Sequence, residues 1–581
     1  MTFEIVKNQF IKDGKPIKLI SGAVHYFRNM PDTWPDIFEK MVAMGCNCVE
    51  TYCAWNMHEK KPGEYDFTGN LDIARFIKTA EAAGLMVIVR PGPYICAEWE
   101  FGGLPWWIQA DEGIEIRCSN PVYIKHFDRY LDHLLAEVRP LLSTNGGPVI
   151  MLQCENEYGY YGDDKEYLKY LRDGYIRRGI DVPLFTSDGT SMSDLLDGHI
   201  EGCLPTLNFG SRVEENFRAH DVLFPDVPKV CMEMWNGWFD AWGDAEHHTT
   251  DAEKYAGVVD DMLKRGGLNI YMFIGGTNFG FTSGANHYET FAPDVTSYDY
   301  DALLSECGDV TPKYYAVREV IKKYIDHPLP EVPGNRTKRA FGKLTLTEHA
   351  GFFDTVGKLA SPVHSDVPLC MEKYGQGYGY IAYRTVLNRD YNNTTLSFES
   401  LGDRAQIYVN RGLVGVVYVN DPKLEIKISA KAGDVLTVLC ENMGRCNFGP
   451  KMMRKKGIAG RCLLGGKIHF GWDVYTLPMD NLDLVEYTDE MPYEKSAFHR
   501  GFIEIDEPAD TFLKLDSFKK GFVLVNGYNI GRYWEIGPQV TLYIPASLLK
   551  KGRNEIVVFE GDGLTGEPTV EFCDTPILSK K

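Results

Sequence analysis

The first 325 residues alternate between short apolar runs and amphipathic segments, and this alternation most constrains the fold. The apolar runs have the length and composition of buried strands. Helical patterns separate most of them, although the segment after Gly210 is only weakly helical. Eight strand–helix units predict a parallel sheet with right-handed crossovers, closed into a (β/α)8 TIM barrel. The expected strands are 18–27, 48–55, 85–90, 149–153, 183–187, 206–209, 229–234 and 269–274.

The sequence pattern changes after the proline-rich segment 328–333. Beyond it, short runs of strand-forming residues are bounded by Gly, Asn and Asp, and helical patterns nearly vanish. Such a pattern is typical of β-sandwiches. A change near residues 485–495 suggests two all-β modules. We therefore expect a catalytic barrel over 1–330, a first β-sandwich domain over 331–490 and a second over 491–581.

The charge balance excludes several classes of partner. The formal net charge is −20, which disfavours nucleic acids and anionic membrane surfaces because both attract basic proteins. The N-terminal residues lack a basic leader followed by an apolar run, so we expect a cytoplasmic protein. The 14 cysteines lack zinc-like spacing, and Asp299 and Asp301 lack the spacing of a calcium loop. We therefore expect no metal and no cofactor, and leave a homo-oligomer open.

The run 148–159 contains the first candidate for catalysis. Its apolar half, Val149 to Leu152, reads as a strand, and several carboxylates and amides follow directly. Buried carboxylates are costly unless paired, and in a barrel the carboxyl ends of the strands form the active site. Glu157 ends the fourth expected strand and Glu233 ends the seventh. Two carboxylates flanking one pocket are what glycosidic bond cleavage requires, with retention expected at a separation of about 5–5.5 Å.

Several short segments of the sequence match the motifs of one known family. Together they resemble glycoside hydrolase family 35, the β-galactosidases of a large retaining barrel clan, and more closely its smaller bacterial-type members than the lysosomal ones. The resemblance implies jelly-roll, galactose-binding-like sandwiches after the barrel, and its smaller members often prefer β-1,3-linked galactose. The matching phrases are 21–28 (SGAVHYFR), 50–59 (ETYCAWNMHE), 90–99 (RPGPYICAEW), 146–159 (GGPVIMLQCENEYG), 273–279 (FIGGTNF), 296–302 (TSYDYDA) and, more loosely, 471–472, 526–534 and 541–545.

The resemblance implies a role for individual residues. Glu157 is expected to be the general acid/base, Glu233 the nucleophile, and Asn156 a donor to the 2-hydroxyl of the sugar. Further substrate-binding residues are expected to hold the galactose hydroxyls or, for the two tryptophans, to wall the aglycone side: Tyr52, Cys96, Ala97, Glu98, Tyr300, Trp238 and Trp242. The substrate would be an oligosaccharide or glycan with a terminal non-reducing β-D-galactose, cleaved in exo fashion.

Competing readings concern both residues and function. Glu155 lies two residues from Glu157, which places both on one side of a regular strand, and we expect it to support the site rather than catalyse. Arg28 and Arg90 are expected to pair with carboxylates at the barrel mouth. The alternative functions are a barrel β-glycosidase of another sugar specificity and an inactive carbohydrate-binding protein. A substrate contact and a structural role both stay open for Glu50, Glu59, His25, His58 and Tyr298.

Overall fold

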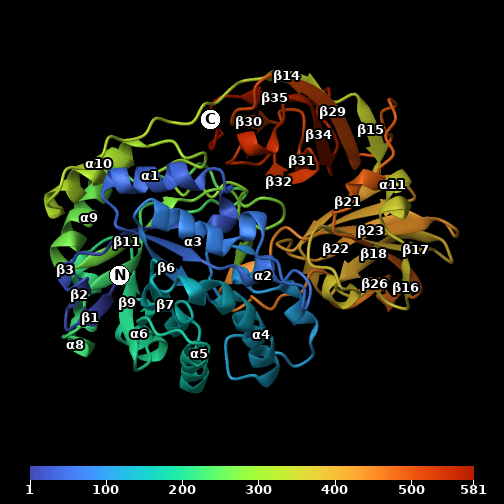
Figure 1. The fold of residues 1–581 in the computed structure, drawn as a ribbon. Coiled ribbons are helices and arrows are strands. Elements are labelled where there is room, and N and C mark those ends of the chain that lie inside the picture. The colour runs from blue at the N-terminus through green and yellow to red at the C-terminus, as the bar shows by residue number, and fades with distance from the viewer. Residues whose placement is uncertain (581) are drawn as a thin grey trace.

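The computed structural model describes residues 1–580. Its N-terminal half is a closed barrel of parallel strands in the order β10-β11-β4-β5-β6-β7-β8-β9 (Figure 1). The predicted barrel is confirmed, with every expected strand present. The barrel strands are β4 (Ile20–Val24), β5 (Cys48–Tyr52), β6 (Met86–Arg90), β7 (Val149–Gln153), β8 (Leu184–Asp188), β9 (Cys203–Asn208), β10 (Val230–Trp235) and β11 (Gly267–Ile274).

Helices surround the barrel and shield the outer face of its strands (Figure 1). Several begin at a side chain that accepts a hydrogen bond from a backbone N–H of the first turn, as Asn120, Asp164 and Asp251 do. Two short helices replace a full one after β9, in agreement with the weak periodicity there. The α-helices of the barrel are α1 (Trp34–Met44), α2 (Trp55–His58), α3 (Ile73–Ala82), α4 (Pro121–Val138), α5 (Lys165–Arg177), α6 (Met192–Gly198), α7 (Val213–Asn216), α8 (Arg218–Leu223), α9 (Ala252–Arg265) and α10 (Pro312–Ile321).

A small sheet closes the end of the barrel at which the strands begin. It consists of β1 (Phe3–Val6), β2 (Gln9–Lys12) and β3 (Lys15–Ile17). Phe3 and Phe10 are buried in one apolar cluster with Leu19, Met86 and Ile150, which lie at or near the starts of barrel strands. Because apolar side chains fill this end, a ligand must enter from the opposite end, where the strands finish.

Two sandwiches follow the barrel, each built from two sheets around its own apolar core. In the first, the sheet β16-β28-β17-β23-β20-β21 packs on β22-β18-β26-β27. In the second, the sheet β15-β29-β34-β31-β32 packs on β14-β35-β30-β33. The first module comprises β16 (Val363–Ser365), β17 (Tyr380–Val386), β18 (Tyr391–Phe398), β19 (Leu401–Gly402), β20 (Arg404–Val409), β21 (Gly412–Tyr418), β22 (Glu425–Ala430), β23 (Val435–Glu441), β24 (Cys446–Phe448), β25 (Gly457–Ile458), β26 (Cys462–Leu464), β27 (Lys467–Ile468) and β28 (Trp472–Leu477).

The second module is not continuous in sequence. Its strands β14 and β15 precede the whole first module, and pair with β35 and β29 near the other end of the chain (Figure 1). The expected boundary at 331 therefore differs from the observed pairing, because residues 342–351 belong to the second sandwich. The module comprises β14 (Gly342–Thr345), β15 (Glu348–Gly351), β29 (Ala497–Ile505), β30 (Thr511–Lys514), β31 (Lys520–Val525), β32 (Tyr528–Trp534), β33 (Thr541–Ile544), β34 (Gly552–Glu560) and β35 (Thr569–Cys573), with α11 (Phe352–Leu359) after β15.

The first module also reaches the barrel. Its strand β24 pairs in parallel with β12 (Ala285–His287), which in turn pairs with β13 (Phe291–Pro293). Both β12 and β13 lie in the long segment after the last barrel strand, so this three-stranded sheet joins the first sandwich to the carboxyl end of the barrel.

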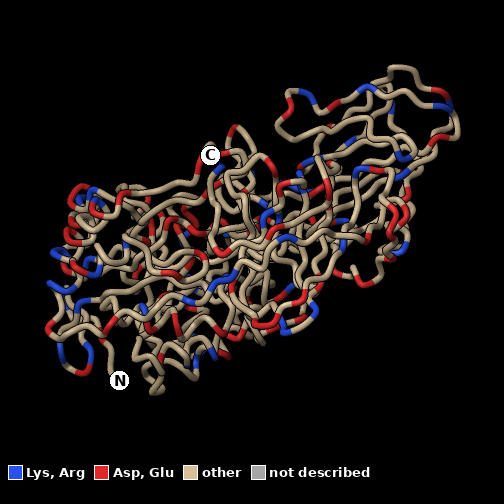
Figure 2. The backbone as a smooth tube through the Cα atoms, turned by 90° about the horizontal axis from the view of Figure 1, so that it is seen from above, with Lys and Arg blue, Asp and Glu red and all other residues tan. Residues whose placement is uncertain are grey.

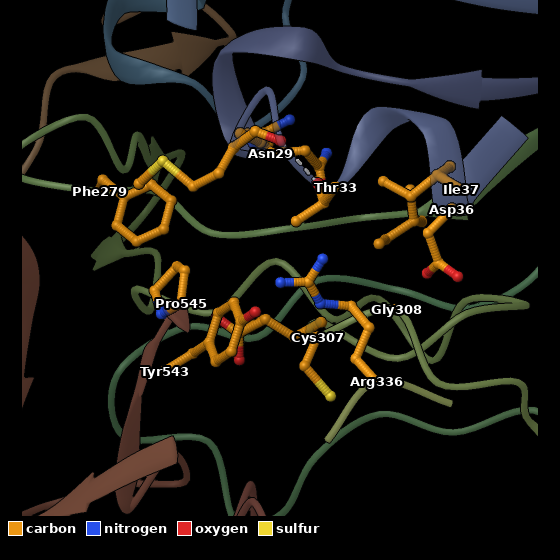
Figure 3. A pocket seen from close by; sticks show the side chains of 14 residues that line it. Asn29, Thr33, Asp36, Ile37, Phe279, Cys307, Gly308, Arg336, Tyr543 and Pro545 are labelled. Atoms are coloured by element: carbon orange, nitrogen blue, oxygen red, sulfur yellow. Dashed lines mark hydrogen bonds between the residues drawn. The ribbon is translucent and has the colours of Figure 1, made fainter. Parts of the chain in front are cut away.

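The junction between the barrel and the second module contains a small cavity (Figure 3). Its volume is about 10 Å³, which is room for about one water molecule. Arg336 lies on its wall and pairs with Asp510 of the second module at 3.0 Å and with Asp32 of the barrel at 3.3 Å. The cavity is too small for a sugar. The ion pairs of Arg336 at its wall connect the barrel to the second module.

Charge is mixed along the whole molecule. Acidic and basic residues are interspersed along the backbone of the barrel and of both sandwiches (Figure 2). Among residues 1–580, no helix has both the length and the apolar character needed to cross a membrane. All 14 cysteines are free thiols, most of them buried.

Candidate active site

One large cavity opens at the carboxyl ends of the barrel strands. Its volume is about 600 Å³, within the range of small-molecule sites. Glu157, which follows β7, and Glu233, which lies in β10, both line it, so the structure brings the two predicted carboxylates together. They are only 8% and 7% exposed. The other lining residues are Cys96, Ala97, Glu98, Tyr160, Trp235, Trp238, Phe239, Ala241, Asp244, His248, Tyr271, Asn286, Tyr288, Ala292, Tyr300 and Phe448.

Glu233 is held in place by three hydrogen-bond donors. Its Oε1 lies 2.8 Å from Arg90 Nη2 and 2.5 Å from the Tyr52 hydroxyl. Its Oε2 accepts a hydrogen bond from Trp235 Nε1 at 3.2 Å. Charge-assisted hydrogen bonds of this kind are among the stronger ones in proteins. A buried carboxylate held by fixed donors has the geometry that a nucleophile needs.

Glu157 has a different environment. Burial raises the pKa of its carboxyl group to about 8, the Glu233 carboxylate adds to this, and a hydrogen bond from Asn208 opposes it. That bond joins Asn208 Nδ2 to Glu157 Oε1 at 3.0 Å, and Ser187 Oγ fixes the amide by donating to its Oδ1 at 2.6 Å. The two carboxylates thus have unequal environments: a cation and two neutral donors hold Glu233, whereas the pKa of Glu157 is raised, and such a difference separates acid from nucleophile.

Glu155 does not point toward Glu157, so the expectation from strand alternation is wrong. Regular strand geometry ends at Gln153, and Glu155 and Glu157 both adopt left-handed backbone angles, with φ of 59° and 47°. Glu155 turns away and accepts two hydrogen bonds from Arg117, at 2.9 and 2.8 Å. Its buried ion pair gives it a structural role beside the site, as expected from the sequence.

Asn156 lies between the two carboxylates in sequence and beside Glu233 in space. Its Oδ1 accepts hydrogen bonds from Tyr52 and Arg90, each at 2.8 Å, and from Gln153 at 3.1 Å. Its buried Nδ2 has no hydrogen-bond partner among residues 1–580. A buried donor without a partner is costly, so this amide is suited to donate to a ligand.

The residues 96–98 form a turn with three successive left-handed conformations, at φ of 56°, 59° and 48°. Such backbone is strained for residues other than glycine and persists where surrounding contacts impose it. Arg28 Nη2 donates to the Ala97 carbonyl at 2.5 Å, and the Tyr298 hydroxyl donates to Glu98 Oε2 at 2.5 Å. Burial raises the pKa of Glu98 to about 7. The turn therefore presents backbone and side-chain groups to the cavity in a fixed arrangement.

The two arginines expected to pair with carboxylates behave differently. Arg90 does so, since it contacts Glu233 and lies 3.8 Å from Glu50. Arg28 makes no ion pair in the described part of the chain and instead donates to the Ala97 carbonyl and, at 2.8 Å, to Asn278 Oδ1. Its expected pairing is wrong, because neutral acceptors, the Ala97 carbonyl and the Asn278 amide oxygen, occupy its guanidinium donors.

The first β module contributes a residue to the cavity that sequence reasoning missed. Phe448, in β24, lines it, and the neighbouring Asn447 donates to Glu98 Oε1 at 3.4 Å. The Asn447 carbonyl accepts a hydrogen bond from the Tyr94 hydroxyl at 2.6 Å. No local pattern marks this segment, because its role depends on a contact between residues about 350 positions apart.

The remaining predicted residues fall into three groups. Tyr300, Trp238 and the turn 96–98 line the cavity, whereas Tyr52 and Asn156 lie behind Glu233 and contact it or its neighbours. Trp242 is 8% exposed and is not among the lining residues, and Trp235, which was not predicted, takes a place there. For five residues the sequence allowed either a substrate contact or a structural role. None of them is among the residues that line the cavity: Glu50, Glu59, His25, His58 and Tyr298.

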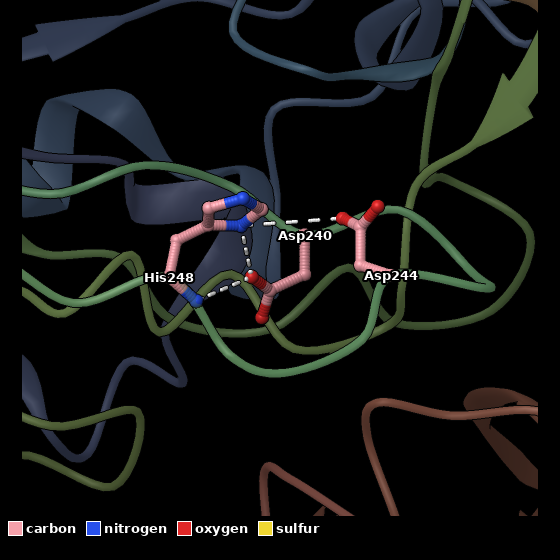
Figure 4. A group of neighbouring side chains, drawn as sticks. All are labelled: Asp240, Asp244 and His248. Atoms are coloured by element: carbon pink, nitrogen blue, oxygen red, sulfur yellow. Dashed lines mark hydrogen bonds and ion pairs between the residues drawn. The ribbon is translucent and has the colours of Figure 1, made fainter.

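A group of possible metal-binding side chains lies at the edge of the cavity (Figure 4). Asp240, Asp244 and His248 each bring one ligand atom within 4.8 Å of the others. Both oxygens of Asp240 already accept hydrogen bonds, from His248 Nδ1 at 2.8 Å and from His247 Nδ1 at 2.6 Å. A cation would have to displace these donors, so the group is a hydrogen-bonded cluster in its present form.

The fold and the site together define a class. A TIM barrel that holds two carboxylates in unequal environments within one sugar-sized cavity has the apparatus of a glycoside hydrolase. A comparison with family models matches "Glycosyl hydrolases family 35" over residues 9–324. The chain belongs to this family. Two further models match the sandwiches: "Beta-galactosidase, first all-beta domain" over 368–478 and "Beta-galactosidase, galactose-binding domain" over 496–554.

Curated relatives match over nearly the whole chain. A protein from Xanthomonas manihotis named "Beta-galactosidase" is 41% identical over 557 residues, covering 94% of this chain and 92% of the relative. Proteins of the same name from Bos taurus and Homo sapiens are 39% and 38% identical, covering 99% and 98% of this chain and 94% and 90% of theirs. The similarity therefore includes both sandwiches as well as the barrel.

Proposed function

We propose that the protein is a retaining exo-β-galactosidase that hydrolyses terminal non-reducing β-D-galactose from oligosaccharides or glycans. The observation that carries this proposal is the asymmetric pair Glu157 and Glu233 within one cavity. The names of the relatives support galactose as the sugar. Exo action is supported by burial, because the carboxylates are nearly buried whereas the cavity residues Trp238, Tyr160 and Tyr288 are 43%, 49% and 55% exposed. A glycan end can thus enter past exposed aromatic rings.

The first step would form a covalent intermediate. Glu157, protonated, donates its proton to the glycosidic oxygen as the bond from that oxygen to the anomeric carbon breaks. A carboxylate oxygen of Glu233 forms a bond to the same carbon, giving a galactosyl ester and a free alcohol. Arg90 and Tyr52 hold the attacking carboxylate in place. Fixed groups of this kind lower the barrier because no reorganisation is needed during the reaction.

The second step would reverse these roles. Glu157, now a carboxylate, removes a proton from water while the water oxygen attacks the anomeric carbon. The ester bond to Glu233 breaks, and galactose leaves with its original configuration. The free Nδ2 donor of Asn156 is suited to the 2-hydroxyl of the sugar, a contact that strengthens in the transition state of such reactions. Tyr300 and the turn 96–98 would hold the other hydroxyls.

The sugar specificity is tested with a panel of nitrophenyl glycosides. We expect the β-galactoside to be cleaved with a higher kcat/KM than the β-glucoside or the β-glucosaminide. Proton NMR of the first product formed would report the anomeric configuration, with β-galactose expected. Faster cleavage of either other sugar would overturn the galactosidase assignment, and α-galactose as the first product would overturn retention alone.

The pH dependence follows from the raised pKa of Glu157. The general acid must carry its proton to act, so the active form is present below the pKa of about 8 and is lost as pH rises through it. We therefore expect kcat/KM to fall about tenfold per pH unit above this value. Measuring kcat/KM for a disaccharide substrate between pH 6 and 10 checks this, and a profile that stays level to pH 10 would contradict it.

Trp238 is proposed as part of the aglycone side. It lines the cavity, is 43% exposed and stacks on Phe239 at a ring separation of 5.2 Å. We take the contact between the exposed Trp238 ring and the leaving sugar to contribute about 1 kcal/mol, the size of other aromatic contacts. We therefore expect Trp238→Ala to raise KM about fivefold for a β-1,3-linked disaccharide. KM for methyl β-galactoside should change less than twofold, since its aglycone is too small to reach the ring. An equal effect on both substrates would refute the assignment.

A further inference from the structure

The more exposed residues that line the cavity, which we call its outer part, include two polar side chains, Asp244 and His248, 37% and 47% exposed, and aromatic rings. Asp244 and His248 line it from the segment that follows β10, and Trp238, Tyr288 and Phe448 are among the rings that share the space. In the part of the chain that the structure describes, no Lys or Arg side chain lines this cavity. Among the lining residues, Asp244 is the carboxylate that lies in the same segment as His248, away from Glu98, Glu157 and Glu233 in sequence.

This polar wall is fixed from behind. Asp240, 7% exposed, accepts hydrogen bonds from the backbone N–H and from Nδ1 of His248, at 2.9 and 2.8 Å (Figure 4). His247 lies between Asp240, at 2.6 Å, and Asp299, at 3.3 Å. Burial opposes a charge on His247, but hydrogen bonds to the two carboxylates raise its pKa to about 10. The segment is thus held to the loop that carries Tyr300.

Hydrogen-bonding roles at the wall follow from these contacts. When the His248 ring carries one proton, and that proton lies on the Nδ1 that contacts Asp240, its Nε2 atom is an acceptor. The Ala241 N–H donates to Asp244 Oδ2 at 2.7 Å, and the other oxygen of that carboxylate accepts from no side chain or backbone group in residues 1–580. Within those residues, Asp244 makes no ion pair with Lys or Arg. Both groups therefore offer acceptors to whatever occupies the outer cavity.

We propose that Asp244, together with His248, selects the sugar on the leaving side: it accepts hydrogen bonds from neutral hydroxyl-bearing or amine-bearing residues and rejects residues that carry sulfate or carboxylate. The inference rests on the proposed function, since the outer cavity is the leaving side only if Glu157 and Glu233 cleave the glycosidic bond. A sulfate is acceptor-only and negative. It can neither donate to this wall nor escape the repulsion of the Asp244 carboxylate, which is weakly screened in a partly closed cavity.

The test compares two disaccharides that differ only in one anion. One is β-galactosyl-1,3-N-acetylglucosamine, and the other is the same disaccharide with a sulfate on the 6-hydroxyl of its glucosamine. We expect the wild-type enzyme to favour the neutral substrate about tenfold in kcat/KM at pH 7. Asp244→Asn, which keeps the shape and removes the charge, should reduce this preference about fivefold. Asp244→Glu, which keeps the charge, should retain most of it.

Glu246→Gln is the matched control. Glu246 is exposed, lies two residues from Asp244 and does not line the cavity, so its neutralisation changes the net charge equally. We expect the preference of this variant to equal that of the wild type. The inference is overturned if the wild type cleaves both disaccharides equally well, if Asp244→Asn leaves the preference unchanged, or if Glu246→Gln lowers it as much.

Hydrolysis of nitrophenyl β-galactoside by the wild type distinguishes a failure of the proposed function from a failure of the selection by Asp244. Absence of that activity would refute the proposed function itself. Its presence, with a preference that Asp244→Asn does not change, would refute only the selection by Asp244. Melting curves of each variant establish that the compared proteins are folded. The ratio of kcat/KM for the neutral and the sulfated disaccharide is compared only among folded variants.

Discussion

Glu233→Gln is expected to lower kcat for every β-galactoside by about 10⁴-fold, the size of effect seen when a covalent catalyst is removed. The amide retains the volume of the carboxylate and can still meet Tyr52 and Trp235. It cannot form the galactosyl ester, and it leaves the Arg90 cation without its nearest carboxylate. Initial rates with nitrophenyl β-galactoside, together with a melting curve, measure the loss and exclude unfolding as its cause.

A rescue experiment distinguishes a nucleophile from a residue that only supports the site. In Glu233→Gly the space freed by the side chain admits azide, which is expected to attack the anomeric carbon and give α-galactosyl azide. A β-configured product, or a Glu233→Gln rate within tenfold of the wild type, would contradict the assignment. An inactive carbohydrate-binding protein, the alternative from another class, would have no rate to lose in either variant.

Glu157→Gln is expected to have the second-largest effect, and its size should depend on the leaving group. For a disaccharide, whose leaving oxygen needs a proton, kcat/KM should fall about 10³-fold, since general acid catalysis contributes about 10²–10⁴. For a dinitrophenyl galactoside, whose leaving group needs none, the first step should persist and the galactosyl enzyme should accumulate as a burst. The loss of activity above about pH 8 should vanish with the carboxyl group.

Glu155→Gln provides the comparison within the same segment. It weakens the ion pair with Arg117, so the expected result is a lower melting temperature without any dependence on the leaving group. If Glu157→Gln kept wild-type rates on the disaccharide, or if Glu155→Gln showed the sensitivity to leaving group instead, the acid/base role would belong to another residue.

The barrel could be predicted because its signals are local. Most of the strands contain a short apolar run, and Asn120 and Asp251 cap the helices that follow the sequence pattern. Glu157 and Glu233 could be placed at one mouth because the carboxyl ends of all parallel strands share one end of a barrel. The direction of Glu155 could not be predicted, since it depends on a left-handed turn that follows the strand.

The rest of the site depends on contacts that no sequence window contains. Phe448 enters the cavity from a sandwich, and Asn447 touches Glu98 across 349 residues. Asp244 and His248 lie in an irregular segment without helical or strand period, and only their hydrogen bonds to Asp240 and Ala241 turn them toward the cavity. Trp242 follows the expected nucleophile in sequence and is expected on the aglycone side. It lies instead beside Pro293, to whose carbonyl its backbone N–H donates at 2.8 Å.

The interleaved order of the two sandwiches has a consequence for biosynthesis. Strand β14 pairs with β35, and Thr345 faces Thr569 across 224 residues. On the ribosome, β14 and β15 must therefore stay unpaired while the entire first sandwich is translated and folds. Unpaired strand edges of this kind can associate with other nascent chains. We therefore expect the yield of folded protein, and its dependence on chaperones, to be set by the time for which β14 and β15 lack their partners rather than by folding of the barrel.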